Sequence, residues 1–157
     1  MTEEQVLALL GETPVRLAAA ADGVQNRLLA TRPTPQEWSA TDVLAHLRSC
    51  ADVWGGCIQR ILAEDAPTIR AVNPRTYIRE TDYPDLPFRS SLAAFTEQRA
   101  ALLEVLTSLS PQQWSRSATV TGAGRPIQRT VFGYAEWLAT HERSHVKQVV
   151  RVLSALG

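Results

Sequence analysis

The sequence predicts an all-α protein folded as a four-helix bundle, with a long crossover loop between the second and third helices. Its 157 residues suffice for one domain with a buried core, and we interpret residues 1–157 as a single domain. Apolar residues recur at helical spacing in four long segments, and no segment alternates apolar and polar residues for long enough to predict a sheet. Four amphipathic helices in a chain of this length are expected to pack as a bundle.

The first predicted helix has two parts, residues 3–10 and 14–29. Thr13 is the expected N-cap of the second part, and Pro14 then occupies the first turn, where a proline is well tolerated. The apolar face of this second part predicts its contact with the rest of the bundle. It consists of Leu17, Ala21, Val24 and Leu28.

The other three helices have equally clear signals. The second begins at "WSATDV", with Ser39 as the N-cap and Asp42 as an acidic residue in the first turn. The third covers about 91–109, and the last begins near Thr130 and continues almost to the end of the chain. The inward-facing stripe of the second helix is Val43, His46, Cys50, Val53, Cys57 and Ile61. That of the third is Leu92, Phe95, Arg99, Leu102, Leu106 and Leu109, and that of the last is Tyr134, Leu138, His141, His145, Val149 and Val152.

The connection between the second and third helices reads "DAPTIRAVNPRTYIRETDYPDLPF". It contains several prolines and is too long for a hairpin between adjacent helices. It therefore predicts a crossover, and long loops of this kind often cover a functional site.

The composition excludes several classes of function. Sixteen basic residues balance sixteen acidic ones, whereas a nucleic-acid binder normally carries a basic excess. No apolar run approaches the ~18 residues needed to cross a bilayer, and the start "MTEEQ" lacks the layout of a signal peptide. Cys50 and Cys57 would lie about 10 Å apart on a helix, too far for a disulfide. We therefore expect a cytoplasmic protein with free thiols.

All three histidines of the chain fall on the inward stripe of their helices. His141 and His145 are one turn apart on one face, and His46 projects from a second helix. Three imidazoles with a vacant fourth position form an open, catalytic type of metal site. The alternative is that each histidine is a core residue bonded to a protein partner.

The stretch "THERSHVKQ" contains H-E-x-x-H, the motif of zinc metalloproteases. Those enzymes take their third ligand from further along the chain, either a histidine six residues on or a distant glutamate. Here Arg151 stands six residues after His145, and no acidic residue follows Glu142, so the protease interpretation fails. Glu142 could still serve as a base beside a metal. We favour a solvated position for it on the helix flank, because exposed glutamate is the commoner case.

Three further residues are candidates for the site. Cys50, one turn after His46, could approach the metal or be a buried core thiol, which is the commoner case. Gln148, three residues after His145, could orient a ligand imidazole or cap a polar spot at the bundle end. Arg99 could bind a carboxylate of a thiol cofactor or substrate, or extend its head into water. The aromatic residues that could line an apolar pocket, or else belong to the core, are Trp54, Tyr134 and Trp137.

Two stretches resemble the DinB/YfiT-like metal-binding bundles. "QEWSATDVLAHLRSCADVW" resembles the second-helix signature of that family, a Trp-Ser entry followed by an inward histidine. The stretch from Phe95 to Val150 resembles the second half of the family, which ends in H-x-x-x-H-x-x-Q. The resemblance extends over about residues 7–153. It implies a bundle with a crossover, often dimeric, whose metal ligands here would be His46, His141 and His145.

The resemblance also implies a cofactor and an activity. Members bind zinc, nickel or a similar divalent metal, and characterised relatives include transferases that use thiols such as bacillithiol or mycothiol. We therefore expect a metal-dependent thiol S-transferase acting on small electrophiles. The residues alone leave two alternatives open: an open metal site could activate water for hydrolysis, or the bundle could bind a metal without catalysing a reaction.

Overall fold

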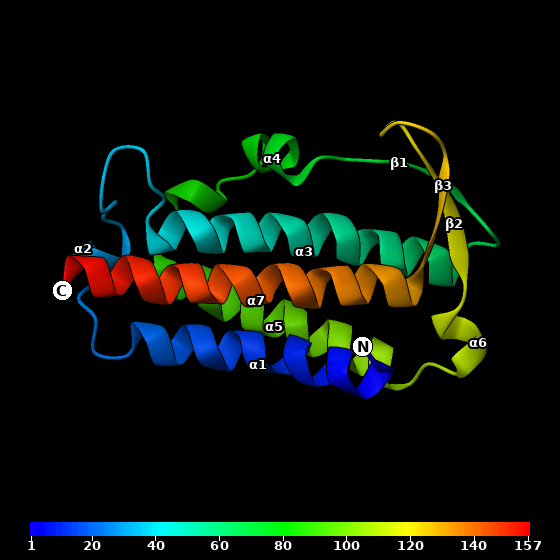
Figure 1. The fold of residues 1–157 in the computed structure, drawn as a ribbon, viewed down its shortest axis with the longest axis horizontal. Helices are drawn as coiled ribbons and strands as arrows, with labels where there is room; N and C mark the ends of the chain where they lie inside the picture. The colour runs from blue at the N-terminus through cyan, green and yellow to red at the C-terminus, as the bar shows by residue number, and fades with distance from the viewer.

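Four long helices form the bundle in the computed structural model, which describes residues 1–157 (Figure 1). They are α1 (Glu3–Ala21), α3 (Ala40–Ala63), α5 (Phe88–Thr107) and α7 (Val131–Leu156). α7 packs against α1 and α3, and α5 packs against the same two helices from the other side. The predicted four-helix bundle is confirmed. None of these helices combines the length and apolar character needed to span a lipid bilayer.

The direction of the helices explains the long crossover. α3 and α5 run the same way, opposite to α1 and α7 (Figure 1), so the chain must travel back along the bundle between α3 and α5. This return contains β1 (Thr68–Arg70), α4 (Pro74–Tyr77) and two 3-10 turns, Ile78–Glu80 and Tyr83–Asp85. It packs over α3, as the predicted crossover requires.

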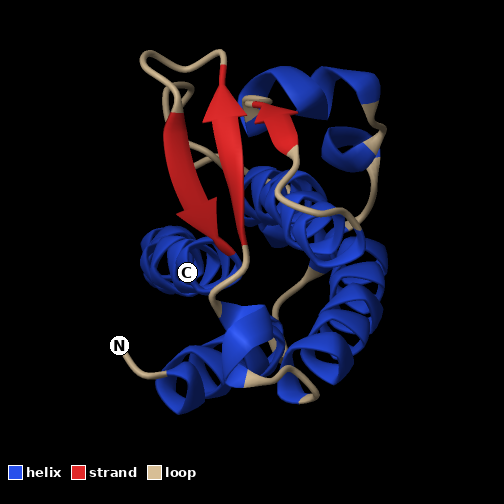
Figure 2. Ribbon diagram, turned by 90° about the vertical axis from the view of Figure 1, so that its right-hand side faces the viewer, coloured by secondary structure: helices blue, strands red, loops and turns tan.

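A small sheet at one end of the bundle was not predicted (Figure 2). β2 (Ser117–Thr121) pairs with β1 in parallel and with β3 (Ile127–Thr130) in antiparallel orientation. The turn between β2 and β3 contains Gly122 and Gly124, both with the positive φ that glycine adopts at low cost. Strands of three to five residues are too short to show a reliable alternating pattern, which is why the sequence did not reveal them.

The predicted starts of α3 and α7 are correct. The Ser39 side chain accepts a hydrogen bond from the Asp42 backbone N–H at 3.0 Å, and the Asp42 carboxylate accepts one from the Ser39 N–H at 3.0 Å. The Thr130 hydroxyl accepts from the Gly133 N–H at 2.9 Å. Each cap satisfies backbone donors that have no partner within the helix.

The predicted break in the first helix is wrong. α1 continues through Pro14 to Ala21, and a separate short helix, α2, covers Asn26–Leu29. Thr13 is not an N-cap, because its hydroxyl donates to the Leu9 carbonyl at 3.3 Å and to a residue of α7. Pro14 has no N–H for the carbonyl one turn before it. A buried arginine of α5 supplies that missing donor, as described below.

The core consists of two apolar clusters along the bundle axis. One lies toward the sheet and includes Leu10, Trp54 and Leu138. The other includes Leu17 and Phe95. The buried polar residues Thr13, Arg99 and Glu142 occupy sequence positions between the two clusters on their respective helices, so a polar layer crosses the middle of the bundle.

Candidate metal centre

The three histidines meet between α3 and α7. His46 projects from α3, and His141 and His145 project from the facing side of α7. The Nε2 atom of His141 lies 3.3 Å from Nε2 of His46 and 3.2 Å from Nε2 of His145. The structure therefore brings together the three residues that the sequence pattern turned inward.

The spacing of these nitrogen atoms suits a shared metal ion. In a tetrahedral site with metal–nitrogen bonds of about 2.1 Å, two ligand nitrogens are about 3.4 Å apart, close to the 3.2 and 3.3 Å found here. A neutral imidazole carries a single N–H, so three converging nitrogens are poorly served by hydrogen bonds among themselves. The donor set fits a divalent cation.

Gln148 orients one of the three rings. Its amide oxygen lies 2.7 Å from Nδ1 of His145, and because that oxygen can only accept, the proton is placed on Nδ1. The Nε2 lone pair of His145 then faces the other two histidines, which is the arrangement a metal ligand needs. The other rings are less constrained, since Nδ1 of His141 is buried without a hydrogen-bond partner.

Burial keeps the histidines neutral. It lowers the pKa of His46 and of His141 to about 4, and the neighbouring His145 acts in the same direction on both. Burial also lowers the pKa of His145, although its hydrogen bond to Gln148 opposes that change. Neutral imidazole is the form that binds a metal, so the unprotonated site is ready at physiological pH.

Cys50 lies beside the cluster. Its Sγ is 3.5 Å from Nε2 of His46 and 3.9 Å from Nδ1, and the potential ligand atoms of Cys50, His46 and His141 all lie within 4.8 Å of one another. Burial raises the pKa of this thiol to about 12. A sulfur sharing an ion with Nε2 would lie much farther from Nδ1 than from Nε2, whereas here the two distances are similar. The geometry favours the three-histidine set, with Cys50 packed against the ring of His46.

The preferred solvated position of Glu142 is wrong, because its side chain is fully buried. One carboxylate oxygen accepts from Arg99 Nη1 at 2.7 Å and from the Thr13 hydroxyl at 2.9 Å, and the other accepts from Arg99 Nη2. Both oxygens are occupied, so Glu142 is not placed to act as a base. The angle of Glu142 from the histidines turns its side chain toward Thr13 of α1 and Arg99 of α5.

Both roles considered for Arg99 are also wrong, since it is buried and paired within the bundle. Its Nη1 also donates to the Leu10 carbonyl at 3.0 Å, the group that Pro14 leaves without a helical donor. Arg99 thus balances the charge of Glu142 and donates a hydrogen bond to the Leu10 carbonyl, which lacks a donor within α1. It has no contact with the histidine cluster.

Two cavities open beside the histidines. One of about 370 Å³ adjoins His46, and one of about 280 Å³ adjoins His145. Arg75 and Trp38 line both, with the Arg75 guanidinium 5.1 Å from the centre of the Trp38 ring. The other basic residues at these openings are Arg32 and Arg79 at the first and Arg151 at the second. Sequence reasoning missed Arg75, because nothing in "NPRTY" shows that the crossover folds back to this point.

A polar latch fixes the crossover on the bundle. The Asp52 carboxylate of α3 accepts hydrogen bonds from the hydroxyls of Tyr77 and Tyr83 at 2.9 and 2.5 Å, and from the Gln98 amide of α5 at 2.6 Å. Both tyrosines belong to the crossover. The latch therefore holds the segment that carries Arg75 beside the histidine cluster.

Comparison with known proteins agrees with this architecture. The family model of the DinB superfamily matches residues 9–149. The structure of YfiT from Bacillus subtilis, described as a probable metal-dependent hydrolase with an unusual four-helix bundle topology, superposes with a TM-score of 0.81 at 20% sequence identity. The match covers 99% of this chain and 87% of that chain. The search of curated proteins found no match. Because the family model covers most of the chain, the protein belongs to the DinB superfamily.

Proposed function

We propose that this protein is a metal-dependent enzyme that activates a low-molecular-weight thiol for transfer to a small electrophile. The observation that carries the proposal is the convergence of three imidazoles beside cavities lined by arginine, with Nε2 of His141 3.3 Å from that of His46 and 3.2 Å from that of His145. Imidazole ligands suit zinc and nickel, which are the metals we propose.

The residues of the cluster would have separate tasks. His46, His141 and His145 would hold the ion, and Gln148 would keep His145 in the correct tautomer. A divalent ion with an open position supplies positive charge that lowers the pKa of a thiol or a water molecule bound there. The buried surroundings of the histidines limit the access of bulk water, which strengthens such electrostatic effects.

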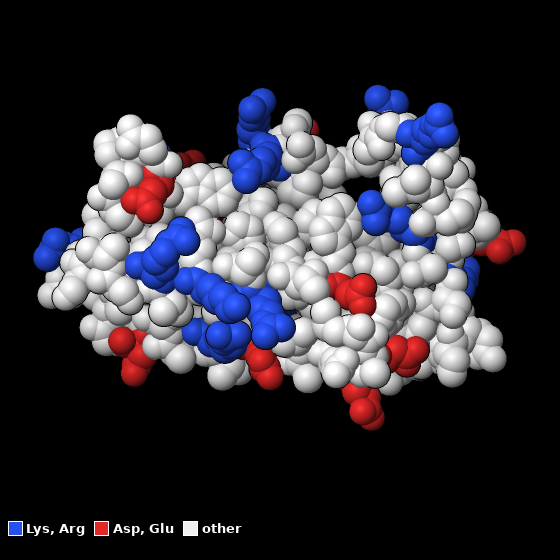
Figure 3. Space-filling model, in the orientation of Figure 1, with Lys and Arg blue, Asp and Glu red and all other residues white.

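Arginines outnumber the acidic residues, Glu37 and Asp42, around the openings, which supports a substrate with an acidic group. Arg75 lies at both cavities, and no carboxylate of the protein forms an ion pair with it. Exposed basic residues recur at four-residue intervals along α7, at Arg143, Lys147 and Arg151. Figure 3 shows basic side chains gathered in the left half of the view, where the C-terminal half of α7 runs. A thiol that carries a carboxylate fits these surroundings, because arginine binds carboxylates with charge-assisted hydrogen bonds.

A metal-dependent hydrolase is the second candidate, supported by the likeness in fold to YfiT, a probable metal-dependent hydrolase. A general base beside the metal would assist the activation of water for hydrolysis. The motif residue best suited to that task, Glu142, has both oxygens engaged by Arg99 and Thr13. This observation favours thiol transfer over hydrolysis.

A third candidate is a metal-binding bundle without catalysis. It would require Cys50 to rotate and fill the open position as a thiolate. Cobalt(II) can report on this, because a thiolate ligand adds sulfur-to-metal charge-transfer absorption. Absence of that absorption, and an unchanged spectrum in Cys50→Ala, is the result expected for the open three-histidine site.

The first test of the proposal is metal content. Protein purified without a histidine tag should contain about one divalent ion per chain, and His145→Ala should lose it. Ser144→Ala is the matched control, because Ser144 is exposed on the same helix. If wild-type protein holds no metal after incubation with zinc and nickel, the enzyme proposal fails.

The second test separates transfer from hydrolysis. The zinc- or nickel-loaded protein is incubated with cysteine and 1-chloro-2,4-dinitrobenzene, and formation of the thioether is followed by absorbance. A rate that requires both the thiol and the three histidines supports transfer. Hydrolysis of a p-nitrophenyl ester without any thiol, together with no thioether formation, would support the hydrolase instead.

A further inference from the structure

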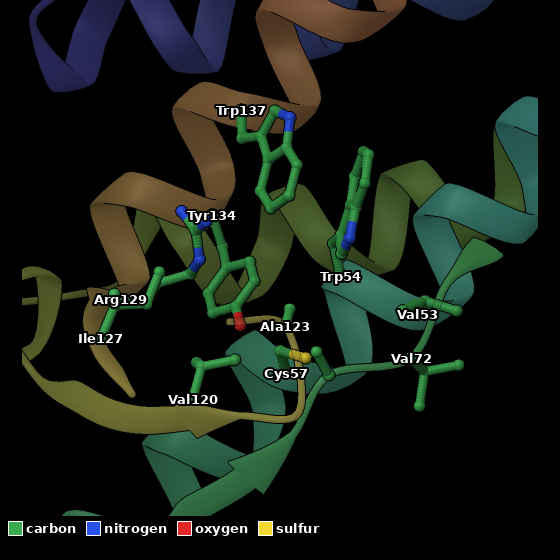
Figure 4. Close-up of a pocket in the computed structure, with 11 residues that line it drawn as sticks. Val53, Trp54, Cys57, Val72, Val120, Ala123, Ile127, Arg129, Tyr134 and Trp137 are labelled. Carbon is green, nitrogen blue, oxygen red and sulfur yellow. The ribbon is translucent and has the colours of Figure 1, made fainter. Parts of the chain in front are cut away.

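A third cavity, of about 100 Å³, lies between the bundle and the small sheet (Figure 4). Eleven residues from α3, the crossover, the β2–β3 hairpin and α7 line it, and ten of them are hydrophobic. Arg129 is the exception and the only charged residue among them. The cavity is distinct from the two arginine-lined openings beside the histidines.

Aromatic side chains form one wall of this cavity. The rings of Trp54 and Trp137 stack with centres 4.3 Å apart, and Tyr134 stacks on the other side of Trp137 at 6.4 Å. The same Trp54 ring meets His141 edge-on, with centres 5.1 Å apart. The aromatic residues that the sequence singled out therefore line a pocket, and Trp54 separates that pocket from the histidine cluster.

The rim exposes apolar surface to an unusual degree. Val72 is 50% exposed, Ile127 42% and Trp137 38%, and these three are half of the six large hydrophobic residues that are exposed anywhere on the chain. They come from three separate segments, the crossover, β3 and α7, and lie together at the rim of this cavity. Apolar surface gathered around a cavity is typical of a binding site, since scattered exposed residues would need no such arrangement.

Arg129 gives the pocket its single charge. Its Cζ lies 4.6 Å from the centre of the Trp137 ring, and no carboxylate of the protein lies within ion-pair distance. The Cys57 thiol and the Tyr134 hydroxyl are close neighbours on the lining, and burial raises the pKa of both, so neither is ionised at neutral pH. The cationic head of Arg129 is therefore uncompensated at the edge of an apolar cavity.

We propose that this cavity binds a small aromatic carboxylate, with the ring against the aromatic wall and the carboxylate on Arg129. An apolar cavity of about 150 Å³ holds a benzene molecule. This cavity is smaller, about 100 Å³, so a single ring would extend past it onto the exposed rim of Val72, Ile127 and Trp137. A free arginine beside that ring position selects an anionic substituent. The inference goes beyond the proposed enzymatic function, because this binding does not require a metal.

The test uses phenylacetate and its neutral analogue phenylacetamide. Each is titrated into the full-length protein in the presence of a chelator, and binding is followed by tryptophan fluorescence and by calorimetry. We expect phenylacetate to bind at least tenfold more tightly than the amide. The His145→Ala variant should bind phenylacetate as wild type does, which keeps the result independent of the metal centre.

Two variants make the test specific. Arg129→Gln should weaken phenylacetate about tenfold and leave the amide unchanged, whereas Arg125→Gln, an exposed arginine of the same hairpin, should change neither. Val72→Phe adds a ring at an exposed rim position and should abolish binding of both probes without affecting folding. The proposal is overturned if wild type does not bind phenylacetate at millimolar concentration, if Val72→Phe still binds it, or if Arg129→Gln has no effect. It is equally overturned if Val72→Phe only converts a dimer to a monomer, since the apolar rim would then be covered by a second copy.

Discussion

Glu142 has a structural role although it stands in an H-E-x-x-H motif. It is fully buried, both of its oxygens are bonded to Arg99, and Thr13 donates to one of them. Burying a charged pair is costly in itself, but removing one member leaves the other charge without compensation. The motif in this chain therefore combines two candidate metal ligands with one member of an internal ion pair.

Substitution of Arg99 should destabilise the protein strongly. We expect Arg99→Met to lower the free energy of unfolding by about 3–5 kcal/mol, because it leaves the Glu142 charge buried and unpaired. The double variant Arg99→Met/Glu142→Leu should recover much of that loss. Urea unfolding followed by circular dichroism measures both. If Glu142→Gln instead abolished activity with stability and metal content unchanged, Glu142 would be a catalytic base and our interpretation would be wrong.

Arg75 should distinguish thiols by their charge. In the thioether assay, Arg75→Gln should lower kcat/KM for cysteine about tenfold, because the variant loses a charge-assisted bond to the carboxylate. Cysteamine lacks the carboxylate and should react equally well with both proteins. Arg70→Gln, on the neighbouring strand β1 and outside these cavities, is the control. An equal loss with both thiols would remove Arg75 from substrate recognition.

The histidine cluster should make the metal-free protein sensitive to acid. The pKa of His46 and of His141 is about 4 in the folded protein, against about 6.5 in an unfolded chain. Between these values the unfolded state binds more protons, so the free energy of unfolding falls as the pH decreases from about 6.5 to about 4. Urea unfolding in the presence of a chelator should show a loss on the order of 3 kcal/mol, about half of what two shifts of this size would give without solvent screening. In His46→Gln/His141→Gln this loss should be clearly smaller, and an identical pH dependence in both proteins would contradict the assignment.

At the level of secondary-structure elements, the crossover decides which side of the bundle carries the site. It is attached by the hydroxyls of Tyr77 and Tyr83, which share the Asp52 carboxylate with Gln98. Arg48 adds a contact over the Tyr83 ring, 3.7 Å from its centre. One acidic residue of α3 thus holds a segment that has few buried side chains of its own.

Removal of this latch should loosen the crossover while the four long helices remain folded. Asp52→Ala leaves three donors without their acceptor, so we expect trypsin to cleave after Arg75 and Arg79 several-fold faster than in wild type. Helical circular dichroism at 25 °C should be unchanged. Asp65→Ala is the control, since Asp65 lies just beyond α3 and has no ion pair. Equal cleavage rates in wild type and Asp52→Ala would show that other contacts hold the crossover.

At the level of the whole molecule, the arrangement of helices assembles the candidate site. α3 and α7 are antiparallel neighbours, so a histidine in the first third of α3 faces histidines near the middle of α7. α3 and α5 are parallel, so their connection must run the length of the bundle and passes over this pair. The same topology leaves the hairpin at the opposite end, where it completes the apolar cavity around Trp137.

The sequence by itself determined the four-helix bundle, though not the extent of its first helix, together with the caps at Ser39 and Thr130 and the inward direction of the three histidines. Local hydrogen bonding and apolar periodicity depend on near neighbours in the chain, so these features could be predicted without a structure. Gln148 was predictable for the same reason, because it lies within one turn of His145.

Only the tertiary structure decided the surroundings of Glu142, Arg99 and Arg75, and the existence of the sheet. Periodicity identifies the apolar stripe of a helix, but it does not show how many neighbours that helix has. α7 packs against α1 as well as α3, so its buried arc is wider than its apolar stripe, and Glu142 on the flank becomes a core residue. Arg99 and Arg75 meet their surroundings across long separations in sequence, and the three short strands pair only because the crossover returns beside the hairpin.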